Sequence, residues 1–274
     1  MKILFENHSI FLNTDYFFPG KPAIIFIHGF TGSSNDWFEI IPRIDNHFSV
    51  VAVDLIGHGK SSSPNNSKFY EISAINKEIK KIIEVLKLDK VILAGYSMGG
   101  RVALNFANEF PNFVNGLILE STTAGIKDKK ERDDRYKNDL SLSQKILDDG
   151  IEKFVDYWIN LPIFSSQKNL SKEKLNDIRL RKLNNDPIGL SNSLIGYSTG
   201  QMPPLFGRLS NFNFPVLLIS GEKDAKFCKI NSEMNDLIPF SEHKIVKGAG
   251  HNIHLEMPSD FVILVNRFLR NNFI

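Results

Sequence analysis

The stretch VILAGYSMGGRVAL, Val91–Leu104, decides the predicted fold. Its first four residues, Val91–Ala94, form an apolar run typical of a strand buried on both faces. Gly95–Gly99 then fits the pattern G-x-S-x-G, between this strand and a predicted helix at Met98–Phe110, which is the context of a nucleophile elbow. The glycines permit a strained turn. We therefore expect the Ser97 hydroxyl to stand above the sheet at a helix N-terminus.

Apolar runs and helical patterns alternate along most of the chain, as expected for a mostly parallel sheet covered by helices on both faces. The other predicted strands are Ile3–Phe5, Ile10–Leu12, Ala23–Ile27, Ser49–Val53, Gly116–Leu119, Val216–Ile219 and His243–Val246, and the other predicted helices are Ile72–Leu88 and Phe261–Leu269. The charged segment 123–210 breaks the alternation. We predict an α/β core, residues 1–122 and 211–274, with a helical cap inserted at 123–210 after a strand ending near Glu120.

Composition excludes several classes of protein. The chain has 274 residues, a net charge of +2 and no long basic run, so nothing indicates nucleic-acid binding. Cys228 is the single cysteine, which rules out a disulfide within the chain and favours a reducing compartment. There is no run of about 18 apolar residues and no signal-like segment, so we expect a cytoplasmic protein without a membrane span. The histidine and cysteine spacing predicts no metal site, and monomer or homodimer stays open.

A catalytic serine hydroxyl needs a base, and the base needs an acid that orients it. Asp224, in GEKDAKF, follows the predicted strand Val216–Ile219, and His251, in GAGHNIHLE, follows the last predicted strand. The chain order Ser97, Asp224, His251 is that of an α/β-type triad. Each residue falls at the C-terminal end of a strand, where open α/β sheets build their sites. Glu120, at another strand end, stays open as an alternative acid.

Two backbone N–H groups are candidates for an oxyanion hole beside Ser97. One belongs to Met98, which follows the serine directly, and the other to Phe30, in the loop HGFTG after the predicted strand Ala23–Ile27. We expect the titratable side chains around these motifs to be structural rather than catalytic; these are His28, His58 and His254.

The stretches HGFTGSSNDW, DLIGHGKS, GYSMGGRVAL, GEKDAKF and GAGHNIHLE together resemble the α/β-hydrolase superfamily. Within it, GYSMGGR and the cap stretches ERDDRYKND, FVDYWINLPIF and RLRKLNNDPIGLSNSLIGYSTGQMPPL are most similar to the 2-succinyl-6-hydroxy-2,4-cyclohexadiene-1-carboxylate synthases of menaquinone (vitamin K2) biosynthesis. The resemblance implies a lyase without a cofactor that eliminates pyruvate from 2-succinyl-5-enolpyruvyl-6-hydroxy-3-cyclohexene-1-carboxylate. It implies that Ser97 is the general base, that His251 relays its proton and that Asp224 holds the imidazole.

The implied substrate is a small anion with three carboxylates, which arginine can bind through paired hydrogen bonds. Arg101 lies one helical turn after Ser97, so its side chain can reach the pocket. By the resemblance, the other substrate-binding residues are Tyr96, Arg135, Trp158 and Arg181, with Arg179 as a neighbouring alternative to Arg181. Without the resemblance, ERDDRYKND is typical of a solvated helix face with charge pairs.

Two other functions stay open. A small-molecule esterase or C–C bond hydrolase would use the same triad through an acyl-enzyme, whereas a non-catalytic hydrolase-fold protein would only bind its ligand. The intact set of Ser97, Asp224 and His251 argues against the non-catalytic alternative. Arg101 argues against an esterase for neutral esters, because such a substrate gains nothing from a cation.

Overall fold

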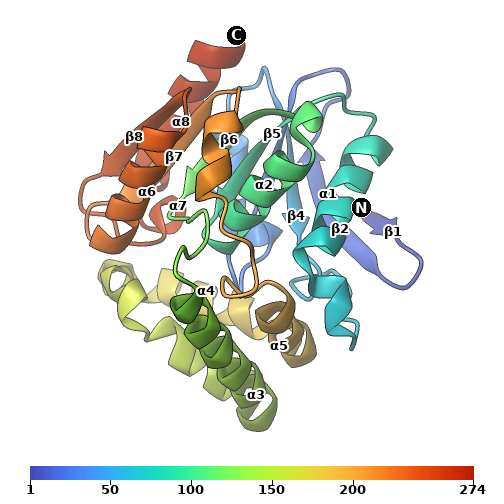
Figure 1. Ribbon diagram of the computed structural model, residues 1–274, viewed down its shortest axis with the longest axis vertical. Helices are drawn as coiled ribbons and strands as arrows, with labels where there is room; N and C mark the ends of the chain where they lie inside the picture. The colour runs from blue at the N-terminus through green and yellow to red at the C-terminus, as the bar shows by residue number, and fades with distance from the viewer.

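A computed structural model describes all residues from 1 to 274, and its centre is an eight-stranded sheet (Figure 1). The strand order is β1-β2-β4-β3-β5-β6-β7-β8. Only β1 and β2 run antiparallel to their neighbours, and the other strands pair in parallel. The strands are β1 (Lys2–Leu4), β2 (Ser9–Tyr16), β3 (Ala23–Ile27), β4 (Ser49–Asp54), β5 (Val91–Tyr96), β6 (Val114–Glu120), β7 (Val216–Gly221) and β8 (Ser241–Val246).

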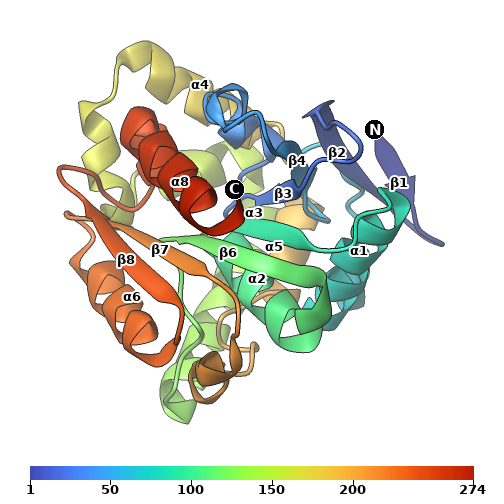
Figure 2. The same ribbon diagram turned by 90° about the horizontal axis from the view of Figure 1, so that it is seen from above.

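Helices cover both faces of this sheet, as Figure 2 shows. One face carries α1 (Ile72–Val85), α2 (Met98–Glu109) and α6 (Ala225–Leu237), and the other carries α8 (Pro258–Phe273), which follows the short α7 (Ile253–Glu256). The 3-10 helices are η1 (Ser34–Trp37), η2 (Ile41–Arg43), η3 (Ser67–Tyr70), η4 (Pro111–Phe113), η5 (Pro162–Asn169) and η6 (Phe206–Asn211). The predicted α/β architecture is therefore confirmed.

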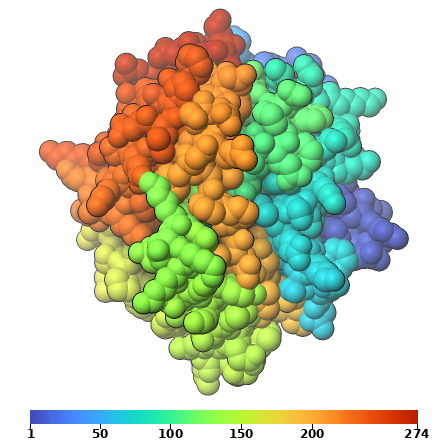
Figure 3. Space-filling view, viewed as in Figure 1, coloured from blue at the N-terminus to red at the C-terminus, as the bar shows by residue number.

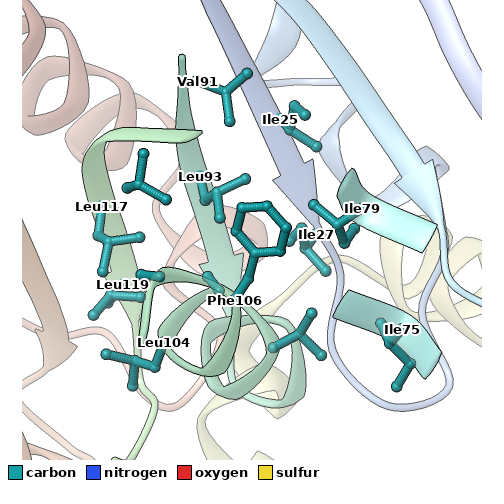
Figure 4. Packing of buried hydrophobic residues seen from close by; sticks show 14 of the residues in the cluster. Ile25, Ile27, Ile75, Ile79, Val91, Leu93, Leu104, Phe106, Leu117 and Leu119 are labelled. Atoms are coloured by element: carbon teal, nitrogen blue, oxygen red, sulfur yellow. The ribbon is translucent and has the colours of Figure 1, made fainter. Parts of the chain in front are cut away.

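The central strands are apolar on both sides because each of their faces is covered. Along β3, Ile25 and Ile27 belong to one core cluster, while Ile24 and Phe26 belong to the other. Figure 4 shows the first cluster, where Phe106 of α2 packs among side chains of β3, β5 and α1. Parallel strands buried in this way appear in a sequence as continuous hydrophobic runs, which is why they were predictable.

The chain leaves the sheet after β6 and forms the helices of the insertion before it returns at β7. These elements are α3 (Lys129–Ile159), η5, α4 (Lys172–Leu183) and α5 (Pro187–Gly196), and they lie against one edge of the core (Figure 1). They form a continuous surface with the core in Figure 3. Gly150, with φ +78°, breaks α3 into two helical parts. The domain division at residues 123 and 210 stays a prediction.

The predicted elements differ from the structure in several of their ends, as for β2, predicted over Ile10–Leu12 and found over Ser9–Tyr16, and in one helix that was missed. The helix expected over residues 72–88 ends at Val85, and α6 was not predicted, because its buried residues are only Asn231 and Met234 and it shows no clear apolar stripe. No helix of the structure is both long enough and apolar enough to cross a membrane.

The corner between β5 and α2 depends on glycines on both sides of Ser97. Ser97 itself has φ +50°, a region that residues with a side chain seldom adopt. A Cβ at Gly99 would overlap the carbonyl oxygen of Ile27, and one at Gly95 would overlap the carbonyl oxygen of Gly99. The N-terminus of α2 therefore packs directly against the end of β3, at a distance that only glycine permits.

We predict that Gly99→Ala lowers the free energy of unfolding by about 1–3 kcal/mol, the usual cost of overpacking, because the new methyl meets backbone that cannot rotate away. Gly207→Ala is the matched control, since nothing lies within 4 Å of the Cβ position there. Urea unfolding of both variants measures the difference. A Gly99→Ala midpoint equal to that of the control would contradict the close approach of α2 and β3.

Candidate active site

Ser97, His251 and Asp224 form a continuous hydrogen-bonded chain. The Nε2 atom of His251 lies 3.2 Å from Ser97 Oγ, and its Nδ1 atom lies 2.6 Å from Asp224 Oδ2. A carboxylate accepts from Nδ1–H, which leaves Nε2 free to accept the serine proton. Asp224 and His251 are both buried. The arrangement is that of a nucleophile or base activated through an oriented imidazole.

Three parallel strands deliver these side chains to the same edge of the sheet. Ser97 follows β5, Asp224 follows β7 and caps α6 by accepting the Phe227 N–H, and His251 follows β8. The Ser97 corner is fixed by its own backbone, since its N–H donates to the Glu120 carbonyl at 2.8 Å. These contacts hold the serine in its strained conformation without using its hydroxyl.

Glu120 is not the acid of this chain of hydrogen bonds. Its carboxylate accepts from Nδ1 of His254 at 2.7 Å and from the His254 backbone N–H at 3.0 Å. The pair is fully buried, and Trp37 stacks on the His254 ring at 4.1 Å between centroids. The alternative left open by the sequence is thus resolved geometrically, with Asp224 beside His251 and Glu120 in a separate structural pair.

Two backbone N–H groups near Ser97 have no acceptor within the chain. They belong to Phe30 and to Met98, the first residue of α2. An N–H at the start of a helix carries partial positive charge and is suited to a developing anion. The two candidates for an oxyanion hole are therefore available, although their role in catalysis stays a prediction.

His28 fixes the loop that carries Phe30. Its Nε2 atom accepts the Leu55 N–H at 3.0 Å, and its Nδ1 atom donates to the Gly29 carbonyl at 2.7 Å. Burial lowers the pKa of His28, as it does that of the neighbouring His58, so both rings stay neutral at neutral pH. His28 therefore has the structural role expected from the sequence.

A cavity of about 1020 Å³ opens above Ser97, between the strand ends and the insertion. Its walls come from α3, η5 and α5 on one side and from the core on the other. Of the predicted site residues, its lining includes Phe30, Tyr96, Ser97, Met98, Arg101, Arg135, Trp158 and His251. The indole Nε1 of Trp158 is buried without a hydrogen-bond partner.

Arg101 projects from the first turn of α2 into the wall of this cavity. Its Nη1 atom donates to the Tyr197 carbonyl at 2.7 Å, which fixes one arm of the guanidinium, and no carboxylate pairs with it. Burial, reinforced by nearby Arg135, lowers the pKa of Arg101 to about 10. The group therefore remains a cation at neutral pH, and it is incompletely neutralised by its surroundings.

The two predicted arginines of the insertion differ in position. Arg135 lines the cavity, where its Nε donates to both oxygens of Asp139 at 2.9 Å and its two Nη atoms make no hydrogen bond. Arg181 does not line the cavity, and its role in substrate binding stays a prediction. Its Nη1 donates to the Asn35 carbonyl at 2.8 Å, behind the loop that carries Phe30.

Arg179, the alternative to Arg181, also lies elsewhere, in ion pairs with Asp156 and Glu152 of α3. Sequence patterns did not separate these arginines, because a charged amphipathic helix does not indicate which of its faces meets the core.

Three cations of the cavity were missed by the sequence reasoning, and one of them, Lys127, pairs with Glu233. Lys145 lies over the Tyr157 ring at 4.4 Å, and Lys226 lies near the Phe227 ring, and neither pairs with a carboxylate. No local signal distinguishes them from other surface lysines, although Lys226 is two residues after Asp224. No group of three or more His, Cys, Asp or Glu side chains is placed to hold a metal ion.

Comparisons with known proteins identify the family of this chain and several similar proteins. Residues 22–258 match the family described as alpha/beta hydrolase fold. A Bacillus subtilis (strain 168) protein, "Putative 2-succinyl-6-hydroxy-2,4-cyclohexadiene-1-carboxylate synthase", is 44% identical over 90% of each chain. The synthase of that name from Enterobacter sp. (strain 638) is 29% identical over 92% of this chain and 93% of its own. The solved structure of MenH from S. aureus gives a TM-score of 0.90 at 33% identity, covering 97% of this chain and 98% of that one.

Proposed function

This chain belongs to the α/β-hydrolase fold family, and we propose that it catalyses the reaction of the 2-succinyl-6-hydroxy-2,4-cyclohexadiene-1-carboxylate synthases of menaquinone biosynthesis. The enzyme is then a carbon–oxygen lyase that eliminates pyruvate from 2-succinyl-5-enolpyruvyl-6-hydroxy-3-cyclohexene-1-carboxylate. The observation that carries the proposal is a complete triad opening onto a cavity in which three cations, Arg101, Lys145 and Lys226, lack acidic partners.

Ser97 acts as the base in this reaction. Its Oγ takes the proton from ring carbon 2, which is acidic because it adjoins the succinyl ketone, while the serine proton passes to His251 Nε2. The electron pair forms a double bond between ring carbons 2 and 3, the existing double bond shifts to carbons 4 and 5, and the bond between carbon 5 and the ether oxygen breaks. Enolpyruvate leaves, takes up the proton that His251 holds and tautomerises to pyruvate, which restores the triad. Asp224 stabilises the imidazolium that forms.

The two free N–H groups are placed for the charge that this step creates. Removing the proton turns the succinyl ketone into an enolate, whose oxygen carries the developing negative charge. The N–H groups of Phe30 and Met98 have no other acceptor and can donate to that oxygen. No acyl-enzyme is required, and each step uses side chains and backbone groups of this chain.

The charges of the cavity suit a substrate with three carboxylates. Arg101, Lys145 and Lys226 line it without an acidic partner, and Arg135, whose Nε is paired with Asp139, keeps two unbonded Nη atoms. Inside a partly buried cavity such cations attract anions more strongly than they would in bulk water. A neutral ester would leave them unpaired, which argues against a general esterase. The cytoplasmic location expected from the single cysteine stays a prediction.

The test is to supply the purified protein with the enolpyruvyl precursor and to measure pyruvate with a coupled dehydrogenase. We predict that Ser97→Ala lowers kcat by about 10³-fold or more, because the hydroxyl that removes the proton is lost. Ser232→Ala is the control, since Ser232 is exposed on α6, and it should retain full activity. Pyruvate release no faster than the uncatalysed rate, together with rapid hydrolysis of p-nitrophenyl esters, would show an esterase instead.

A second prediction concerns the carboxylate contact of Arg101. We expect Arg101→Met to lower kcat/KM by about 10–100-fold, the range for losing a charge-assisted hydrogen bond. Arg101→Lys should recover only part of the loss, because a lysine keeps the charge but not the paired donors. Arg208→Met, at an exposed position of η6, is the control. Unchanged steady-state kinetics in Arg101→Met would remove the role in substrate binding.

A further inference from the structure

The last turn of α4 and Asn185, two residues after the end of this helix, contact the loop that carries the Phe30 N–H. Lys182 Nζ donates to Thr31 Oγ1 at 2.9 Å, and Asn185 Nδ2 donates to the Thr31 carbonyl at 3.0 Å. Arg181 adds a bond to the carbonyl of Asn35 in the same loop. Three residues of the insertion therefore direct their donors at one core loop, none of them toward the cavity above Ser97.

Thr31 is strained where these donors meet it. It is buried and has φ +65°, which is unfavourable for a β-branched residue. The Gly32 N–H donates to the Gly29 carbonyl at 3.0 Å, so residues 29–32 form a tight turn with Thr31 in the position that normally requires glycine. Strain of this kind persists only where surrounding contacts hold it.

The contacts that tie Thr31 to the insertion lie in the interior of the protein and not on its surface. Asn185 is buried, and its Oδ1 accepts the Gly59 N–H at 3.0 Å, so one side chain joins the insertion to two core loops. Burial lowers the pKa of Lys182, which reflects how far its ammonium is removed from water. Thr31 Oγ1 is the acceptor that the structure offers to this ammonium.

Phe30 is the neighbour of Thr31 in the turn and provides one of the two free N–H groups. Its ring packs edge-on against Trp158 of the insertion at 5.0 Å between centroids. If Thr31 relaxed to a negative φ, the turn of residues 29–32 would rearrange, and the Gly29–Phe30 peptide, which carries the Phe30 N–H, would shift with it. The Phe30 N–H would then leave its place beside Ser97.

We propose that Lys182 and Asn185 are positioning residues for catalysis, which hold Thr31 in its strained conformation and thereby aim the Phe30 N–H at the enolate oxygen. This inference depends on the proposed function in one respect only, which is the identity of the oxygen that accepts the Phe30 N–H. All three triad residues belong to the core, whereas the contacts that hold the Phe30 N–H in place come from the insertion. Neither side chain touches the substrate.

The test uses Lys182→Met and Thr31→Val, which remove the two ends of one hydrogen bond, together with their double mutant. Two rates are measured: pyruvate release, and the labelling of Ser97 by a fluorophosphonate, in which Oγ displaces fluoride from phosphorus. In the labelling reaction a phosphoryl oxygen occupies the predicted oxyanion hole. Its rate can therefore be measured without the natural substrate. Lys172→Met, at an exposed position of the same helix, is the control.

We expect each single variant and the double mutant to lose about 10–100-fold in both rates, with KM unchanged, because a shifted donor weakens transition-state binding only. The double mutant should be no slower than the singles. Thr31→Ser keeps the acceptor and should retain the wild-type rate, which separates this role from loss of folding. Thermal unfolding of every variant accompanies the rates.

Full rates in Lys182→Met and Thr31→Val would overturn the inference, as would independent losses that multiply in the double mutant. A rise in KM with unchanged kcat would also overturn it, since that pattern indicates a substrate contact. If wild-type protein releases no pyruvate but these variants still slow the labelling of Ser97, the proposed function fails and the positioning role stands.

Discussion

The direct packing of α2 against the end of β3 is the constraint on which the site depends. Because Gly99 brings the first turn of this helix against the Ile27 carbonyl, Ser97 is forced into a positive φ and its hydroxyl is raised above the sheet. The same approach brings the N-terminus of α2 beside the loop after β3. The positions of Ser97 and of the Met98 N–H therefore depend on one close contact that any side chain would block.

The core and the insertion contribute different parts of the site. The core supplies Ser97, His251 and Asp224 at the ends of parallel strands, an arrangement that would serve a hydrolase as well as a lyase. The insertion closes the cavity with aromatic side chains and with Arg135, and its α4 contacts support the loop of Phe30. Three cations of the lining without acidic partners, Arg101, Lys145 and Lys226, support the proposal of an anionic substrate.

Most of the fold could be predicted because the features that determine it are local. Buried parallel strands are continuous apolar runs, and a G-x-S-x-G corner between a strand and a helix is typical of a nucleophile elbow. The α/β-hydrolase fold was identified from these features and the synthase family from the resemblance of GYSMGGR and the cap stretches, and both are confirmed. The partners of individual charged residues were not predictable. Arg181 turns to the loop of Asn35, and Glu120 pairs with His254, through tertiary packing that no sequence spacing reports.

The measurement that tests the central claim most directly is a competition between the natural precursor and the same molecule with deuterium at ring carbon 2. A competition experiment measures the isotope effect on kcat/KM. It therefore detects the proton transfer, and the rates of the individual steps need not be measured. If Ser97 removes this proton to expel pyruvate, the unreacted precursor becomes enriched in deuterium as pyruvate accumulates. Pyruvate release without enrichment would contradict elimination that begins with the removal of this proton by Ser97.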